Sequence, residues 1–272
     1  MAVPPLQALV AAGHQVALVV TRADKRRGRG GELSPSPVKA AAVAMGLPVS
    51  HDVDDVLGQG IELGVVVAFG QLIKPHVLAE VPMVNSHFSL LPRWRGAAPV
   101  ERALLAGDTE TGVCLMKVEE GLDTGPVYDT VRVPIAPTAT ADQLRRDLVA
   151  AGSAQLVRML AEPLGVPSPQ QGEPLYAAKV RPAELRIQWD QPADRIDRLV
   201  RLGGAWAEFR GRRVKVLAAA ITPEPASTGY TPTLQRPVPG LCMVTVQPEG
   251  KAPMAFADFE RGVRPAPGET FE

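Results

Sequence analysis

The pattern of apolar and polar positions divides the first half of the chain into short apolar runs that alternate with helical segments. Buried or alternating strands are predicted for residues 14–22, 47–50, 63–70, 82–89, 111–118 and 127–135. Helical periodicity and glycine stops predict helices at residues 4–12, 38–46, 98–108 and 140–163. Strands that alternate with helices in this way favour an α/β domain built on a parallel sheet.

The character of the sequence changes after Glu162. Residues 164–181 are rich in proline and glycine and have no periodicity, so they are predicted to form a linker or wrapping segment. A short helix follows, with strand-like runs at residues 205–211, 212–220, 242–249 and 252–259, which predict a small β-barrel. The predicted domains are therefore residues 1–163 and 182–272, joined by the linker at 164–181.

One element of the expected sheet is missing from the sequence, which opens within the helix at residues 4–12. A βαβ unit needs a strand before its helix, and the first strand of a doubly wound sheet is usually central. Either translation begins upstream of Met1, or the sheet has a gap between the strands near residues 16–20 and 65–68. A gap would expose apolar edges on both of these strands.

Composition excludes several classes of protein. The 272 residues, of which 46% are hydrophobic and 21% charged, are typical of a globular chain. The net charge is zero, so only a local patch could attract nucleic acid. The two cysteines predict no disulfide framework, no zinc-ligand spacing is present, and a reducing cytoplasm is expected. No apolar run approaches the roughly 20 residues that span a bilayer, so no membrane partner is expected.

Candidate chemistry lies in "VNSHFSLLPRWRG", residues 84–96. Asn85 and His87 are two positions apart at the end of a predicted strand, so both side chains point to the same face. Ligands of open α/β sheets bind beyond such strand ends, and Pro92 prevents the strand from continuing. An isolated histidine is more often structural than catalytic. An amide and an imidazole held together here, however, can stabilise an oxyanion and move a proton.

A second polar cluster, "EEGLDTGP" at residues 119–126, forms a predicted loop between two strands, with Asp123 at its centre. Taken alone, a hairpin turn with a capping aspartate is the simpler interpretation. Beside His87, the same carboxylate would raise the basicity of the imidazole or order a water molecule. The sequence alone leaves both interpretations open.

Other motifs fail on their spacing. Ser86 and Ser89 flank the histidine, but no G-x-S-x-G motif exists, which argues against a serine hydrolase. "GRGGEL" does not satisfy the dinucleotide-binding pattern, and "HDVDD" at residues 51–55 is more typical of a solvated loop than of a metal site.

Residues 84–127 closely resemble the core of the methionyl-tRNA formyltransferases, a branch of the 10-formyltetrahydrofolate-dependent formyltransferase family. The Asn-x-His, SLLP and L-D-T-G-P motifs occur in the family's order and spacing. "TRADKRRGRGGELSPSPVKAAA" resembles the insertion loop with which that branch enters the acceptor arm of initiator tRNA. Two C-terminal segments, beginning at "YAAKV" and "VQPEG", resemble the start and end of its second domain. The segment "RLGGAWAEF" is shorter than the family's usual one.

The resemblance implies a Rossmann-like parallel sheet that lacks its first strand, followed by a small β-barrel like an oligonucleotide-binding fold. It also implies transfer of the formyl group of 10-formyltetrahydrofolate to the α-amino group of methionyl initiator tRNA, without a metal. Catalysis falls on Asn85, His87 and Asp123. The folate falls on the three segments with Val67, Ala68, Phe69 and Gly70; Ser89, Leu90, Leu91 and Pro92; and Gly121, Leu122 and Thr124.

Basic residues in two regions are the expected contacts for tRNA. Between Arg22 and Lys39, six basic residues stand against two acidic ones, which gives a local patch in a neutral chain. The expected contacts are Lys25, Arg26, Arg27, Arg29 and Lys39 in this region and Arg210, Arg212 and Arg213 in the predicted barrel. The partners expected are thus initiator methionyl-tRNA and the folate, and the chain is expected to be a monomer.

Two alternatives keep part of this interpretation. A formyltransferase acting on a small amine, such as an amino sugar, would keep the three catalytic residues without needing the basic insertion. A catalytically inactive tRNA-binding relic would explain the missing first strand.

Overall fold

The computed structural model describes residues 1–27, 31–221, 234 and 238–272. These residues form two compact units. The first unit comprises Met1–Val100, Glu110–Pro134 and Arg145–Ala177, and the second comprises Glu101–Thr109, Ile135–Leu144 and Ala178–Glu272. No helix in the described ranges is both long and apolar enough to cross a membrane.

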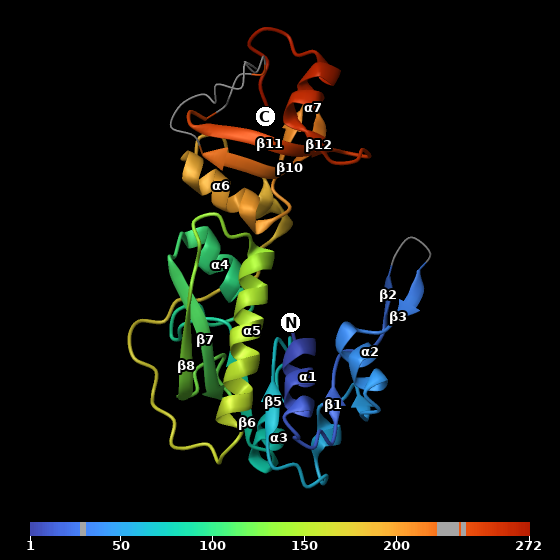
Figure 1. The fold of residues 1–272 in the computed structure, drawn as a ribbon, viewed down its shortest axis with the longest axis vertical. Helices are drawn as coiled ribbons and strands as arrows, with labels where there is room; N and C mark the ends of the chain where they lie inside the picture. The colour runs from blue at the N-terminus through green and yellow to red at the C-terminus, as the bar shows by residue number, and fades with distance from the viewer. Residues whose placement is uncertain (28–30, 222–233, 235–237) are drawn as a thin grey trace. The chain divides into compact units, whose positions relative to one another are not determined.

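A four-stranded sheet forms the centre of the first unit (Figure 1). The helices and strands as far as Met159 are α1 (Val3–Ala11), β1 (Val19–Val20), β2 (Lys25–Arg27), β3 (Glu32–Ser34), α2 (Pro37–Ala44), β4 (Val49–Ser50), a 3₁₀ turn (Asp54–Val56), β5 (Gly64–Val66), α3 (Pro75–Glu80), β6 (Met83–His87), α4 (Pro99–Ala106), β7 (Glu110–Lys117), β8 (Val127–Pro134) and α5 (Ala141–Met159). The strand order in the sheet is β5-β6-β7-β8.

The sheet is mixed rather than fully parallel as the sequence predicted. β5 and β6 are parallel, whereas β7 is antiparallel to both β6 and β8. The short connection between β7 and β8 contains no crossover helix, which a parallel pair would need. The α/β class is confirmed, and the two strands on either side of the 119–126 loop are antiparallel neighbours.

Among the described residues, the strands near residues 16–20 and 65–68 are not paired with each other. β1 pairs with β4 in a separate two-stranded parallel sheet, and β5 pairs only with β6. The expected exposure of both edges is only partial, because Val19 is buried and Val20, Val65 and Val66 are half-buried.

α5 covers one face of β6 and β7. Leu156 of this helix is fully buried with Val84 and Leu115 of the sheet and with Leu9 of α1. Gly152 brings the helix close to the strands, since a Cβ there would lie 3.1 Å from Ser86 Oγ and 3.3 Å from a methyl group of Val113. This packing makes β6, the strand that carries Asn85 and His87, a buried and rigid element.

The second unit contains an antiparallel sheet with the strand order β12-β11-β10-β9. After a 3₁₀ turn (Pro182–Leu185), its elements are α6 (Ala193–Leu202), β9 (Trp206–Phe209), β10 (Arg212–Ile221), β11 (Leu241–Pro248), β12 (Met254–Ala255) and α7 (Phe256–Val263). The strand predicted at residues 252–259 is largely wrong, because α7 begins at Phe256. Phe256 and Phe259 lie on the same face of this helix and are buried in the unit's core.

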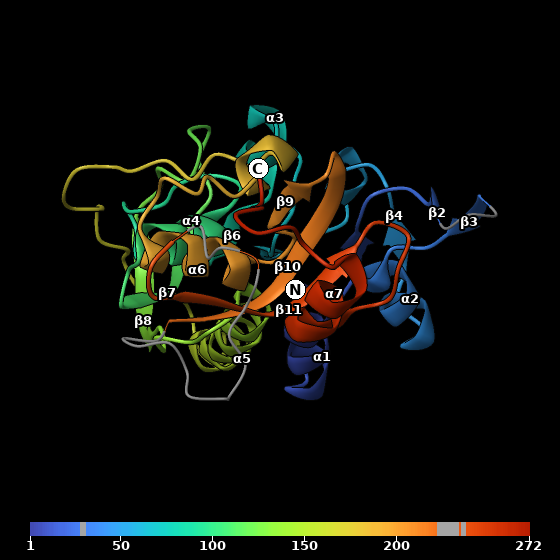
Figure 2. The same cartoon turned by 90° about the horizontal axis from the view of Figure 1, so that it is seen from above.

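The basic insertion forms a hairpin. β2 and β3 are antiparallel, with Arg26 opposite Leu33 and Lys25 opposite Ser34. The hairpin projects beyond α2 in both ribbon views (Figures 1 and 2).

Candidate active site

Asn85, His87 and Asp123 meet at the end of β6. The Asn85 amide Nδ2 donates to Asp123 Oδ1 at 3.3 Å, and His87 Nδ1 lies 3.6 Å from Asp123 Oδ2. The side chains of His87 and Asp123 are only 6% and 13% exposed, so their interaction is largely shielded from water. The adjacency that the sequence left open is therefore present in the structure.

The loop between β7 and β8 carries Asp123 back to the end of β6 because two glycines allow a tight turn. A Cβ at Gly125 would lie 2.0 Å from the carbonyl oxygen of Lys117, and one at Gly121 would lie 2.3 Å from Thr124 Oγ1. Asp123 itself has a φ of 52°, in the left-handed region that non-glycine residues rarely occupy. Such a conformation persists only where the surrounding contacts hold it.

Backbone groups from the segment after β6 complete the site. The Gly96 N–H donates to Asp123 Oδ2 at 2.7 Å, and His87 Nε2 lies 2.9 Å from the carbonyl oxygen of Trp94. Since a carbonyl can only accept, Nε2 is the protonated nitrogen, which leaves Nδ1 facing the carboxylate. When the imidazole is charged, Nδ1 also carries a proton, and the charged ring lies 3.6 Å from the Asp123 carboxylate.

The residues expected to bind folate lie in three segments. Val67, Ala68, Phe69 and Gly70 directly follow β5, whose Val66 pairs with Asn85. Gly121, Leu122 and Thr124 surround Asp123 in its loop, and the Leu122 side chain is 59% exposed.

The third segment, from Ser89 to Pro92, points largely into the protein. Ser89 is fully buried and donates to the carbonyl oxygen of Arg93 at 2.6 Å, Leu90 lies against Gly112, and Pro92 is buried. The Leu91 N–H contacts the sulfur of Cys114, a thiol whose pKa is raised by burial. Residues 89–92 therefore pack mainly against the protein interior and support the end of β6.

Sequence reasoning missed Gln170, which belongs to the predicted linker. Its Nε2 donates to the carbonyl oxygens of Asp123 and Gly125, each at 2.8 Å. Its Oε1 accepts from Arg95 Nε and Nη2, at 3.0 and 2.7 Å. The proline-rich composition indicated that this segment wraps around the domain, but it did not indicate that Gln170 would contact the Asp123 loop.

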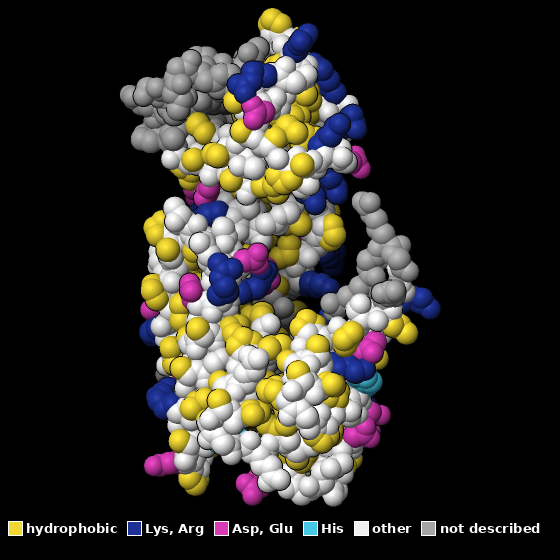
Figure 3. Space-filling model, turned by 45° about the vertical axis from the view of Figure 1, so that its right-hand side comes forward, with side chains coloured by type: hydrophobic (Ala, Val, Ile, Leu, Met, Phe, Trp, Pro, Cys, Tyr) yellow, Lys and Arg dark blue, Asp and Glu magenta, His cyan; other side chains and the backbone are white. Residues whose placement is uncertain are grey.

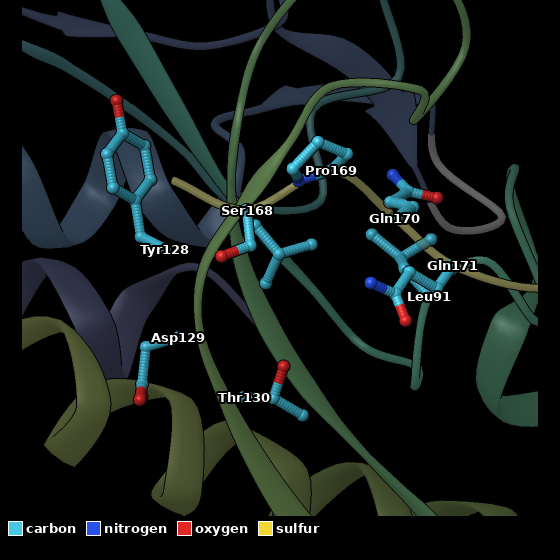
Figure 4. A pocket seen from close by; sticks show the side chains of 9 residues that line it. Leu91, Tyr128, Asp129, Thr130, Ser168, Pro169, Gln170 and Gln171 are labelled. Carbon is cyan, nitrogen blue, oxygen red and sulfur yellow. The ribbon is translucent and has the colours of Figure 1, made fainter. Parts of the chain in front are cut away.

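A cavity of about 480 Å³ lies between this segment and β8 (Figure 4). Its lining includes Tyr128, Asp129 and Thr130 of β8, Leu91, and the run from Ser168 to Gln171. The Asp129 carboxylate accepts from Gln155 Nε2 and Arg158 Nη2 of α5, at 2.8 and 2.6 Å. The cavity is linked to the Asp123 loop through Gln170, which lines the cavity and bonds to that loop.

The basic residues expected to contact tRNA differ in their surroundings. In the first unit, Lys25 and Arg26 lie on β2, together with Arg27, whereas Lys39 is paired with Asp24 at 2.8 Å; Arg29 lies outside the described residues. Lys and Arg side chains are visible on the hairpin and on the second unit in Figure 3.

In the second unit, Arg212 is exposed, and the guanidinium carbon of Arg213 lies 3.8 Å from the centroid of the Trp206 ring. Arg210 donates to both carboxylate oxygens of Glu269 and lowers the pKa of that carboxyl to about 2. Of these arginines, Arg210 is already engaged in a specific ion pair.

The α/β fold and the Asn–His–Asp cluster at a strand end agree with sequence comparison. The family model described as "Formyl transferase" matches residues 5–160, and "Formyl transferase, C-terminal domain" matches residues 179–264. The chain belongs to the formyl transferase family, which confirms the expectation of a formyl-transferring enzyme.

Among its relatives, the methionyl-tRNA formyltransferase of Roseobacter denitrificans is 43% identical over 99% of this chain and 95% of its own length. The methionyl-tRNA formyltransferase of Dinoroseobacter shibae is 45% identical over 84% of this chain and 81% of its own length. The solved structure of WlaRD, a sugar 3N-formyl transferase, has a TM-score of 0.63 and 17% identity, covering 92% and 95% of the two chains. At that identity it shows a shared fold.

Proposed function

We propose that this chain transfers the formyl group of 10-formyltetrahydrofolate to the α-amino group of methionyl initiator tRNA, for translation initiation. The observation that carries the proposal is the contact of Asn85 and His87 with Asp123 at the end of β6. The substrate assignment is supported by the relatives named methionyl-tRNA formyltransferase, which match nearly the whole chain. Because charged initiator tRNA is a substrate, the proposed activity belongs in the cytoplasm.

The reaction requires attack of an unprotonated amine on the formyl carbon. A C–N bond forms, the carbonyl becomes a tetrahedral oxyanion, and collapse of this intermediate expels the folate nitrogen, which takes up a proton. The enzyme must align the two substrates and stabilise the developing negative charge.

The three polar residues suit these tasks. Asn85 Nδ2, which has a second hydrogen besides the one on Asp123, would donate to the oxyanion. A protonated His87, whose two ring nitrogens face Trp94 and Asp123, would stabilise the oxyanion through its positive charge, which low exposure strengthens. The Asp123 carboxylate, already held by Gly96, would orient the imidazole and order a water molecule that relays the amine proton. The segments after β5 and around Asp123 would receive the pterin, whose flat ring suits backbone hydrogen bonds between apolar walls.

The basic hairpin and the exposed arginines of the second unit would contact tRNA phosphates. The projecting β2–β3 hairpin carries Lys25 and Arg26 on a short antiparallel scaffold. Such contacts supply affinity, whereas features of the acceptor stem supply selectivity. A monomer is sufficient for this proposal, since every residue that it uses lies on one chain.

The test is a formylation assay with 10-formyltetrahydrofolate, in which initiator methionyl-tRNA competes with a nucleotide-linked amino sugar. His87→Asn is expected to lower kcat by roughly 100- to 1000-fold, the usual cost of losing one group that stabilises an oxyanion, because it removes the positive charge of the imidazolium. His76→Asn, at an exposed histidine paired with Asp54, is the matched control and should leave the rate unchanged. Preferential formylation of the sugar would contradict the assignment of methionyl-tRNA as the substrate and favour an amino-sugar formyltransferase. Binding of tRNA without formyl transfer would identify an inactive relic.

A further inference from the structure

Gln170 lies in the segment 164–181, which was predicted as a linker. Among the described residues of that segment, it is the one whose side chain bonds both to the Asp123 loop and to Arg95. Its amide nitrogen donates to the carbonyl oxygens of Asp123 and Gly125, and its amide oxygen accepts two bonds from Arg95. Arg95 immediately precedes Gly96, the residue whose N–H binds the Asp123 carboxylate. One side chain thus joins the loop that carries the carboxylate to the segment that receives it.

The segment that presents Gln170 is anchored on both sides by backbone hydrogen bonds. Ser168 and Val127 exchange two bonds, each of 2.8 Å. Further along, the Arg95 N–H donates to Leu175 at 2.8 Å, and the Ala177 N–H donates to Arg95 at 2.7 Å. These bonds fix the backbone around Gln170, so its amide is aimed at the loop with little loss of conformational entropy.

Gln170 holds its neighbours through hydrogen bonds rather than through apolar packing. The side chain is half-buried and borders the cavity of about 480 Å³, with Gln171 beside it (Figure 4). Two of its hydrogen bonds hold a loop whose central residue has a left-handed backbone, and the other two fix the Gln170 amide on Arg95. A residue in that conformation depends on neighbouring contacts to stay there.

We propose that Gln170, held by Arg95, is a positioning residue that keeps the Asp123 carboxylate facing Asn85, His87 and Gly96. The catalytic use of this carboxylate rests on the proposed function, whereas the holding of the loop does not. Gln170 contacts no reacting atom in this scheme and acts only through the position of Asp123.

The first measurement does not depend on activity. Hydrogen exchange of the amides of residues 119–126 is compared for wild type, Gln170→Met and Gln171→Met. Gln170→Met keeps the length of the side chain and removes its four hydrogen bonds, and we expect exchange in the loop to accelerate at least tenfold. Gln171→Met, at the exposed neighbour on the same cavity, should exchange like wild type. Equal loop exchange in Gln170→Met and wild type would overturn the proposal.

The second measurement is kinetic and uses the full chain with initiator methionyl-tRNA. Displacement of a catalytic group by about 1 Å lowers the rate by about 100-fold. We therefore expect Gln170→Met to lower kcat by about 10- to 100-fold and to change the KM for tRNA by less than twofold. Gln170→Glu keeps the pair with Arg95 but turns a carboxylate towards two carbonyl oxygens, and it should show a similar loss.

A double-mutant cycle with Asp123→Ala separates positioning from general damage. If Gln170 acts through Asp123, Gln170→Met should change the residual rate of Asp123→Ala by less than twofold. An unchanged kcat in Gln170→Met, or full additivity in the cycle, would contradict the proposal. If wild type formylates neither tRNA nor the sugar, the proposed function fails while the exchange experiment still decides the role of Gln170.

Discussion

At the scale of single residues, Ser89 shows how a buried hydroxyl organises backbone groups around the site. Its Oγ donates to the Arg93 carbonyl at 2.6 Å and lies 3.5 Å from the Trp94 carbonyl, which also accepts from His87. Ser89 is 0% exposed, so water cannot replace the hydroxyl. The segment that delivers the Gly96 N–H is thereby tied to the end of β6.

Ser89→Ala is expected to lower the free energy of unfolding by about 1–3 kcal/mol, because it removes the donor to the Arg93 carbonyl at a position that is 0% exposed. Urea denaturation measures the change. Ser168→Ala is the matched control, since Ser168 is exposed and pairs with Val127 through its backbone. A change within about 0.5 kcal/mol is expected there, as for most surface substitutions. Equal effects at the two serines would contradict the argument.

The sequence predicted those residues of the site that act through their side chains and lie in short, recognisable motifs. Asn85 and His87 were predicted because strand alternation places both on one face, and Asp123 followed from its loop and the family resemblance. Trp94 and Gly96 contribute backbone atoms, which every residue type carries, so their identity gave no signal. Gln170 is 47 positions from Asp123, and no local pattern encodes a contact over that distance.

At the scale of elements, α2 begins at a residue that combines two functions. Ser36 is the N-cap, and its Oγ accepts from the Lys39 N–H at 3.0 Å. The same oxygen lies 3.0 Å from Thr21 Oγ1, and both side chains are buried. The start of the helix is therefore bonded to the segment after β1.

Ser36→Ala is expected to destabilise the protein by about 1–2 kcal/mol, because it removes the cap and leaves Thr21 without its partner. Thr21→Val removes the same buried contact but keeps the cap, so its effect should be smaller. Chemical denaturation of both variants provides the comparison. A larger loss in Thr21→Val than in Ser36→Ala would show that the cap contributes little.

Long, regular elements could be predicted from the sequence with closer bounds than short ones. The runs at residues 111–118 and 127–135 agree with β7 and β8, because eight residues of alternation or continuous burial leave little ambiguity. The run at residues 14–22 contains only the two-residue strand β1, and the β2–β3 hairpin lies in a segment interpreted as a loop from its composition and from the family resemblance. The run at residues 252–259 was read as strand because period 2 and period 3.6 are hard to separate over so short a stretch.

One contact between elements should depend on pH. Arg210, in the turn between β9 and β10, lowers the pKa of Glu269 to about 2, whereas an unperturbed glutamate has a pKa of about 4.3. A carboxyl whose pKa falls on folding stabilises the folded state above the unfolded value, and this contribution is lost as pH falls towards the folded value.

We therefore expect Glu269→Gln to lower the urea midpoint slightly near pH 7, with the difference disappearing between about pH 5 and pH 2. The effect should be small, because the pair is exposed to solvent. A difference that persists unchanged at the acidic end would show that the ion pair is not its source.

At the scale of the whole molecule, a net charge of zero leaves recognition of a polyanion to local clusters. The described basic residues in these clusters differ in whether a carboxylate already neutralises them. Lys39 and Arg210 are paired with Asp24 and Glu269, whereas Arg212 is exposed on β10. The charge available to phosphates is therefore smaller than the count of lysines and arginines suggests.

The salt dependence of tRNA binding tests this distinction. Each phosphate contact that is lost reduces the slope of log K against log salt by roughly 1. We expect Lys25→Gln and Arg212→Gln each to weaken binding and to reduce the slope by about that amount. Arg210→Gln should leave the slope nearly unchanged and lower the stability of the chain instead, because its charge is already neutralised by Glu269. Filter binding or anisotropy across a salt series gives the slopes. If Arg210→Gln reduces the slope as much as Arg212→Gln does, the pair with Glu269 must open on binding, and Glu269→Gln should then bind tRNA more tightly than wild type.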